Sequence, residues 1–270
     1  MWYKNVEKGE GAGLISPRSV VQFHFPLPLN VMINFIKKKY FRFFESQNVL
    51  KINFIIHKYF KEKNIGTLDL DFSDKPSRTE ILQSIIDEKN YKSYLEIGCW
   101  KNDLFDKVQC QNKIGVDPTS GGTIRKTSDD FFKHNQLKFD CIFIDGLHKY
   151  HQVKKDIINS IDVINDGGVI LLHDCLPINV YAQAIPRCQY NWNGDVWKAI
   201  IDFRTHADLD IYTCYADEGI GVILKRKNRN LLEIENTDFF KMNFKDYFFY
   251  YKKYMNLISY KELMNIVKDY

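Results

Sequence analysis

Two short segments of the sequence bring together the residue types from which enzyme sites are built. In each segment an apolar run leads into a carboxylate and an imidazole: Asp145 with His148, and His173 with Asp174. The ordinary pKa of histidine lies near neutrality, so either imidazole can take a proton from a hydroxyl group. Two carboxylates with an imidazole nearby can instead hold a hard divalent cation such as Mg²⁺.

These residues divide into two predicted sets of roles. We expect His148 to be the catalytic base, with Asp145 beside it, because His148 lies on the turn that would face an acceptor. If a cation binds, the predicted ligands are Asp145, His173 and Asp174. The alternative is structural: His148 would cap the helix that follows, and Asp145 would bond turn amides. Acids after two separate apolar runs favour chemistry over this alternative.

The elements that must position these groups are four apolar runs, each bounded by turn signals. Such runs indicate strands that are buried on both faces of a parallel sheet. Ligands of these sheets bind outside the carboxyl ends of the strands, and adjacent strands lie about 4.8 Å apart. Asp145 and Asp174 should therefore face one cleft. The runs occupy residues 94–98, 113–117, 139–145 and 167–174.

The first two runs end in groups that suit a nucleoside-containing cofactor. Glu96 and Gly98 close the first run, and Asp117 follows Gly98 by 19 residues. In a nucleotide-binding βαβ unit the glycine admits the ligand, and an acid about 20 residues later accepts the ribose hydroxyls. The later glycines of a dinucleotide fingerprint are replaced by 99–101, Cys-Trp-Lys, so no pyrophosphate cradle is evident. This pattern fits the cationic S-adenosylmethionine better than NAD or a flavin, although Glu96 and Gly98 could also be a plain strand end and turn.

A third polar group, Ser128 with Asp129, follows the expected third strand. A hydroxyl or carboxylate there could accept the adenine amino group of a cofactor. Either residue could equally be the N-cap of the helix that begins near Asp130. The two interpretations are compatible.

The composition excludes several classes of protein. The chain has 270 residues and a formal net charge of +4, so no broad nucleic-acid footprint exists. Its six cysteines show no C-x-x-C spacing, which favours a reducing compartment. The first residues carry charges where a signal peptide needs an apolar core, and no window reaches about 18 uninterrupted apolar residues. We therefore expect a cytoplasmic protein without a transmembrane span.

The chain is expected to divide into three parts. Residues 1–66 should be irregular and then helical, 67–230 should form the main domain, and 231–270 should form closing helices that pack on it. Residues 31–63 are unusually aromatic and basic. The preferred interpretation is that aromatics 35–60 pack on the domain or a second subunit, with lysines 37–39 in solvent. The alternative is an interfacial helix on an anionic membrane.

Six motifs in order resemble class I S-adenosylmethionine-dependent methyltransferases, and more narrowly the methyltransferase-24-like group. The resemblance covers about residues 76–226 and implies a Rossmann-like α/β fold, with a mostly parallel sheet, helices on both faces and helical extensions at both termini. It also implies cofactor contacts at Glu96, Gly98, Asp117 and Asp129, and a cation at Asp145 and Asp174. The sequence departs from this family in two places. The glycines that usually follow Gly98 are missing, and His173-Asp174 stands where the metal-dependent enzymes have two acids or an acid and an amide. The motifs lie at 94–98, 114–118, 127–132, 143–150, 168–175 and 193–198.

The expected reaction is methyl transfer from S-adenosylmethionine to a hydroxyl of a sugar, glycan precursor or small metabolite, with or without Mg²⁺. Metal-independent N-methylation of an amino-sugar and a non-catalytic cofactor-binding or assembly protein are the alternatives. Segment 193–198 sits where the acceptor would approach. Asp195 could bond hydroxyls or cap a helix, Trp197 is expected in the core, and Trp192 is left open. A homo-oligomer and peripheral membrane contact are also left open, and no nucleic-acid partner is expected.

Overall fold

The computed structural model describes residues 47–235 and 238–270, all within a unit that spans residues 41–270. The predictions made for residues 1–46, including the exposure of lysines 37–39, lie outside the described residues. No helix in the described ranges is long and apolar enough to cross a membrane.

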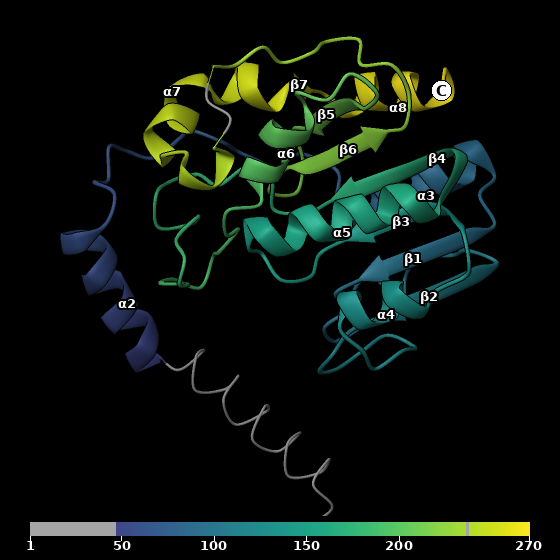
Figure 1. Ribbon diagram of the computed structural model, residues 1–270, viewed down its shortest axis with the longest axis horizontal. Helices are drawn as coiled ribbons and strands as arrows, with labels where there is room; N and C mark the ends of the chain where they lie inside the picture. The colour runs from purple at the N-terminus through teal and green to yellow at the C-terminus, as the bar shows by residue number, and fades with distance from the viewer. Residues whose placement is uncertain (1–46, 236–237) are drawn as a thin grey trace, which may run out of the picture. The chain divides into compact units, whose positions relative to one another are not determined.

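A seven-stranded sheet in the order β2-β1-β3-β4-β6-β5-β7 forms the centre of the fold (Figure 1). The four predicted strands are present and parallel to one another. This confirms the expected Rossmann-like, mostly parallel architecture. These strands are β1 (Ser93–Ile97), β2 (Asn112–Val116), β3 (Phe139–Ile144) and β4 (Ile164–Leu172).

The apolar runs at 211–215 and 220–225 bracket the turn residues 216–219, a pattern that predicts a hairpin, and this hairpin is present. Strands β5 (Asp210–Cys214) and β6 (Ile220–Leu224) pair antiparallel, and β6 inserts between β4 and β5. The sequence did not predict β7 (Leu257–Ile258), which pairs parallel to β5 within the segment expected to be helical. Between β2 and Ser128 the structure has no further strand, and the extended pairing in that stretch is an isolated bridge from Val116 to Ile124.

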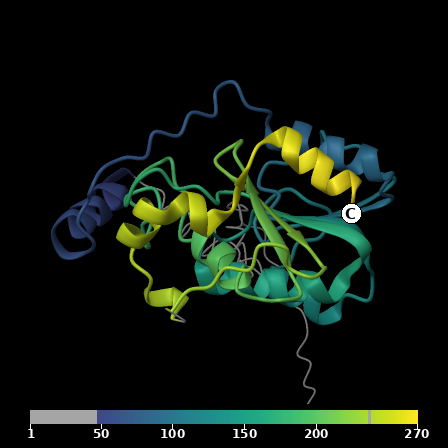
Figure 2. The same cartoon turned by 90° about the horizontal axis from the view of Figure 1, so that it is seen from above.

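Helices cover both faces of the sheet because the strands are apolar on both faces. Alternate side chains of β3 enter different cores: Ile142 and Ile144 lie in one, and Cys141 and Phe143 in the other. Helices α3 and α8 pack on one face, while α4, α5, α6 and α7 cover the other (Figure 2). Their bounds are α3 (Arg78–Lys89), α4 (Ser128–His134), α5 (Tyr150–Val163), α6 (Trp197–Phe203), α7 (Phe244–Met255) and α8 (Tyr260–Lys268), with a short 3₁₀ helix η1 (Phe239–Lys241) before α7.

Helix α3 begins at a complete capping box. The Ser77 side chain accepts a hydrogen bond from the Glu80 amide, and the Glu80 carboxylate accepts one from the Ser77 amide. The cap fixes the first turn of the helix, and with it the backbone of Arg78. That first turn reaches the hairpin between β5 and β6, because the Arg78 amide donates to Asp217 Oδ2 at 2.6 Å.

Helix α2 (Gln47–Phe60) precedes the sheet and docks on the segment around Pro186. Asn53 donates to the Arg187 carbonyl, and a ring nitrogen of His57 lies 3.0 Å from the Pro186 carbonyl. Phe54 packs on Tyr181 with ring centroids 4.7 Å apart. The expectation that the aromatics of this region pack on the domain holds for Phe54, whereas Tyr59 and Phe60 are exposed.

Candidate active site

The sheet register brings the two predicted acids of the catalytic cluster to one edge. Ile144, the last residue of β3, lies beside Leu172, the last residue of β4. Asp145 follows the first strand, and His173 and Asp174 follow the second. His173 and Asp174 are almost fully buried, whereas Asp145 keeps part of its side chain exposed. Sequence and register together therefore place four polar side chains at the carboxyl edge of the sheet: Asp145, His148, His173 and Asp174.

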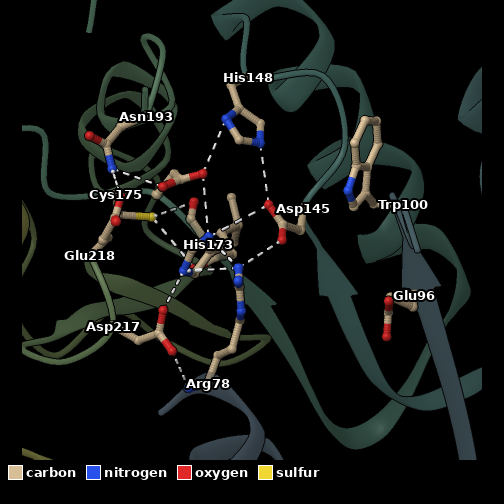
Figure 3. A network of polar contacts seen from close by, with 12 residues as sticks. Arg78, Glu96, Trp100, Asp145, His148, His173, Cys175, Asn193, Asp217 and Glu218 are labelled. Carbon is tan, nitrogen blue, oxygen red and sulfur yellow. Dashed lines mark hydrogen bonds and ion pairs between the residues drawn. The ribbon is translucent and has the colours of Figure 1, made fainter. Parts of the chain in front are cut away.

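His148 is wedged between the two acids. Its Nε2 lies 3.2 Å from Asp145 Oδ1, and its Nδ1 lies 3.1 Å from Asp174 Oδ2 (Figure 3). The alternative that His148 caps helix α5 is wrong, because Lys149 occupies the N-cap position without a side-chain hydrogen bond. Burial favours the neutral imidazole, but Asp174 and Asp145 outweigh it and raise the pKa of His148 above its usual value.

His173 is held mainly by a residue that the sequence did not indicate. Its Nε2 lies 2.8 Å from Asp217 Oδ1, while its Nδ1 points toward Asp174 Oδ2 at 3.3 Å. Burial lowers the pKa of His173, but the facing Asp174 and Asp145 carboxylates raise it well above its usual value overall. Burial likewise opposes the ionisation of Asp145, yet His173 and His148 hold the pKa of that carboxyl below its usual range.

Four further residues complete the polar network, and sequence reasoning assigned none of them to it. Arg78 Nη1 lies 3.0 Å from Asp145 Oδ2. Asn193 Nδ2 donates to Asp174 Oδ1 at 2.8 Å and to Glu218 Oε2 at 2.9 Å (Figure 3). Asp217 and Glu218 come from the hairpin turn, which the sequence marked only as a turn. The sequence offered no local signal that this turn folds over the end of β4.

Three acids of this site have left-handed backbone conformations. The φ angle is +61° at Asp174, +42° at Asp217 and +59° at Glu218. Left-handed residues other than glycine cost free energy, and they persist only where the surroundings hold them. Asp217 and Glu218 are the central residues of the hairpin turn closed by the Gly219 amide and the Ala216 carbonyl, where positive φ angles are usual. Asp174 lies outside such a turn, so its left-handed backbone is the unusual one at this site.

The group best arranged to hold a divalent cation differs in one member from the predicted set. Asp145, His148 and Asp174 offer ligand atoms that all lie within 4.8 Å of one another. The sequence predicted His173 as the imidazole ligand. His173 is instead engaged by Asp217 on one ring nitrogen and has Arg78 Nη1 2.9 Å from the other. His148 replaces His173 in the candidate cation site.

Glu96 and Gly98 close β1 beside this cluster. Glu96 is buried and accepts the Tyr94 hydroxyl at 2.6 Å, and burial raises the pKa of its carboxyl to about 7. Gly98 has a φ of +90°, and a side chain there would start 2.1 Å from the Asp145 carbonyl oxygen. The glycine is therefore required by the close approach of β1 to the β3 turn, before any ligand is considered.

Asp117 is bound by the backbone of its own loop. Its Oδ1 accepts the amides of Thr119 and Ser120, and its Oδ2 accepts the Trp100 amide at 3.0 Å. Trp100 and Asn102 adopt positive φ angles of +47° and +68°, and Trp100 stands at the position of the second glycine of the dinucleotide fingerprint. The loop after β1 thus takes a glycine-like path without glycine, and Asp117 stabilises it.

The predicted adenine contacts lie at the start of α4. Gln152 Nε2 donates to Ser128 Oγ at 3.2 Å and to Asp129 Oδ1 at 3.0 Å. The N-cap is neither of these residues but Thr127, whose side chain accepts the Asp130 amide. Sequence reasoning missed Asp156, whose Oδ1 accepts the same Gln152 amide group and whose burial raises its pKa to about 6.

The segment before α6 serves the site in a different way from that expected. Asp195 caps α5 rather than its own helix, because its Oδ1 accepts the Tyr150 amide at 2.6 Å. Trp197 is fully buried, as predicted. Trp192 stacks on His148 at a centroid distance of 5.2 Å and an interplanar angle of 18°. One face of Trp192 therefore supports the imidazole.

Comparison with known proteins identifies the domain that holds these residues. Residues 95–175 match the family Methyltransf_24, described as a methyltransferase domain. No curated protein matches the sequence. The matched segment runs from within β1 to just past the end of β4, so the parallel part of the sheet is similar to the methyltransferase domain of that family.

Solved structures with a similar fold are distant. A methyltransferase from Podospora anserina bound to S-adenosylhomocysteine has 14% identity and a TM-score of 0.44, covering 56% of this chain and 80% of its own. An O-methyltransferase from Bacillus cereus in complex with S-adenosylhomocysteine has 13% identity and a TM-score of 0.40, covering 66% and 90%. The N-methyltransferase NodS from Bradyrhizobium japonicum has 15% identity and a TM-score of 0.39, covering 56% and 94%. Sequence identities and TM-scores this low indicate no substrate for this protein.

Proposed function

We propose that this protein transfers the methyl group of S-adenosylmethionine to a hydroxyl oxygen of a sugar, glycan precursor or small metabolite. One observation carries the proposal: His148 lies 3.2 Å from Asp145 and 3.1 Å from Asp174, at the edge of the sheet where ligands bind. An oxygen acceptor must lose a proton during methylation. Only the neutral form of His148 can take this proton, and the two carboxylates then stabilise the imidazolium that results.

The cofactor is proposed to lie along the ends of β1 and β2. Glu96 would face its cationic methionine end, and Asp117 would accept a ribose hydroxyl on the lone pairs of Oδ2 that the Trp100 amide leaves available. Ser128 and Asp129 would meet the adenine. Gly98 joins the two halves of the site, because its backbone touches the Asp145–Gly146 turn. The sulfonium would then face the His148 cluster.

In the proposed reaction the acceptor oxygen attacks the methyl carbon in line with the departing sulfur, and the protein supplies the alignment. His148 takes the hydroxyl proton, and the resulting imidazolium is stabilised by Asp145 and Asp174. Asn193 fixes the Asp174 carboxylate, and Trp192 supports the ring of His148. Each of these residues acts by holding the base in place.

A divalent cation fits part of this site. The two carboxylates are the oxygen ligands that Mg²⁺ prefers, and His148 completes the group of three. A bound cation would lower the pKa of an acceptor hydroxyl. Arg78 already lies on Asp145, so it would have to move away from that carboxylate.

Incubation of the protein with S-adenosylmethionine and hydroxylated sugars or metabolites tests the proposal. We expect S-adenosylhomocysteine to form and NMR to show an O-methyl product, in buffer with Mg²⁺ and in buffer with EDTA. An N-methyl product on an amino-sugar would contradict the proposal that the acceptor atom is oxygen, but it would still support methyltransferase activity. Failure to bind S-adenosylmethionine by calorimetry would contradict the proposal as a whole. The reducing cytoplasm, expected from the scattered cysteines, is the proposed location.

A further inference from the structure

Helix α2 has two apolar faces, and only one of them is used by the domain. Leu50, Asn53, Phe54 and His57 recur at helical spacing and face the body of the protein. Leu50 and His57 are buried, and the polar contacts of Asn53 and His57 fix this face to the segment around Pro186. This face explains why the helix docks.

The second face carries five large apolar side chains that remain exposed. They lie at spacings of three, four, seven and eight residues from the first, which is one continuous stripe on a helix. At 100° per residue the stripe is centred on the side of the helix opposite the docked face. Exposure reaches 67% at Tyr59 and 79% at Phe60. The stripe consists of Ile52, Ile55, Ile56, Tyr59 and Phe60.

The charges around the stripe have one sign. The helix contains Lys51 and Lys58, and Lys61 and Lys63 follow directly after it. The sole acid among these residues, Glu62, is occupied by the Phe244 amide within the protein. Exposed apolar side chains flanked by lysines form a surface that complements an apolar layer beneath anionic headgroups.

We propose that the apolar stripe of α2 binds the surface of an anionic membrane. The helix of 14 residues spans about 21 Å at 1.5 Å per residue, which is short of a bilayer core. It therefore lies in the plane of the interface, with the stripe in the acyl boundary and the lysines at the headgroups. The docked face keeps the methyltransferase domain attached above.

The lysines beside the stripe favour a lipid surface over two protein partners, which are a second copy of the chain and the segment that precedes the helix. A second copy would bring its own Lys51, Lys58, Lys61 and Lys63 to the contact, so that cations would face cations without an acid in the stripe to pair them. The chain before the helix is itself basic, with Lys37, Lys38, Lys39 and Arg42 in its sequence. An anionic surface satisfies all of these charges.

Sedimentation of the full chain with vesicles tests the proposal. We expect binding to vesicles of phosphatidylcholine with 30% phosphatidylglycerol, and little binding to phosphatidylcholine alone, at about 0.1 M salt. The variant Ile55→Ser/Phe60→Ser should reduce binding at least tenfold, and Lys51→Gln/Lys58→Gln should reduce it about tenfold. The control variant Phe249→Ser removes a large apolar side chain of α7 whose exposure, 62%, lies between those of Ile55 and Phe60, and it should bind as the parent does.

Three results would overturn the proposal. The first is equal binding to both vesicle types, or binding that the Ile55→Ser/Phe60→Ser variant retains. The second is self-association in gel filtration with light scattering that this variant abolishes, which would assign the stripe to a second copy. The third is a melting temperature at least 5 °C lower in this variant, which would show that another part of the chain covers the stripe. In the Ile55→Ser/Phe60→Ser variant we expect the rate of methyl transfer to a soluble acceptor to be the same as in the parent.

Discussion

Asp217 fixes the orientation of His173. Their side chains meet at 2.8 Å, from Asp217 Oδ1 to His173 Nε2, and Asp217 Oδ2 simultaneously accepts the Arg78 amide at 2.6 Å. A carboxylate on one ring nitrogen sets the tautomer and direction of an imidazole. Because Nε2 is engaged, Nδ1 of His173 faces Arg78 Nη1 and the Asp174 and Asp145 carboxylates. The hairpin between β5 and β6 thereby controls the site at the end of β4.

Asp217→Asn should therefore impair catalysis more than binding. The amide can still accept the Arg78 hydrogen bond but no longer carries the charge that orients His173. We expect turnover to fall about 10- to 100-fold, while the dissociation constant of S-adenosylmethionine measured by calorimetry stays within about twofold. Asp208→Asn, on an exposed residue, is the control. If Asp217→Asn lowers the melting temperature so far that unfolding accounts for the lost turnover, the role of Asp217 is purely structural.

His148→Ala should remove the proposed base. Turnover should fall by about 10²–10⁴-fold, the usual contribution of a positioned base, with cofactor binding intact. Single-turnover formation of S-adenosylhomocysteine is the measurement, and His134→Ala, an exposed histidine of α4, is the comparison. Unchanged turnover in His148→Ala would exclude it as the base.

Glu96 should make cofactor binding depend on pH. Burial raises its pKa to about 7, so the carboxylate that would attract a cationic ligand is a minority form at pH 6 and the majority form at pH 8. Affinity for S-adenosylmethionine should rise about tenfold between these values. Stability should move in the opposite direction, since folding favours the protonated acid and this contribution is lost as pH rises from about 4.5 to about 7. Glu96→Gln should abolish both slopes, and a flat binding profile for the parent would contradict the assignment.

Gly98→Ala should destabilise the fold. The added carbon would start 2.1 Å from the Asp145 carbonyl oxygen, at a φ of +90° that alanine adopts only with strain. We expect a loss of at least about 2 kcal/mol in the free energy of unfolding, measured by urea denaturation. Gly167→Ala, also at a positive φ but with open space around it, separates the effect of crowding from that of backbone strain. Similar losses in both variants would show that crowding at Gly98 is unimportant.

Arg78→Ala should strengthen cation binding. Its guanidinium lies 3.0 Å from Asp145 Oδ2, where its positive charge opposes a divalent cation. The affinity for Mn²⁺, measured by electron paramagnetic resonance, should increase at least about tenfold at low salt, and Lys138→Ala should have no effect. If neither the parent nor the variant binds Mn²⁺ at millimolar concentration, the reaction proceeds without this cation site.

The sheet and its polar ends could be predicted because their signals are local. Each buried strand is a run of apolar residues, and the acid that follows it, such as Asp145 or Asp174, needs no distant partner to be located. Helix α3 carried its own start signal in Ser77 and Glu80. These features depend on neighbours within a few residues, and the structure places them where the sequence did.

The rest of the site depends on contacts between distant segments. Asp195 was expected to bond substrate or cap its own helix, but it caps a helix that begins 45 residues earlier in the chain. Glu218 enters the site only because β6 folds back antiparallel onto β4, which no local pattern of the turn specifies. The choice of His148 over His173 in the candidate cation site likewise depends on Asp217, a residue of the same hairpin.

The bond from the Arg78 amide to Asp217 joins residues that lie 139 positions apart. During synthesis, β1, β3 and β4 can emerge from the ribosome and pair before the hairpin exists, so the acids at their ends first meet solvent. Completion of the site must wait for nearly the whole domain, because contacts of such long sequence separation form slowly. A nascent or truncated chain that ends before residue 217 would therefore lack an oriented His173. Catalytic competence would be among the last properties that this protein acquires as it is made.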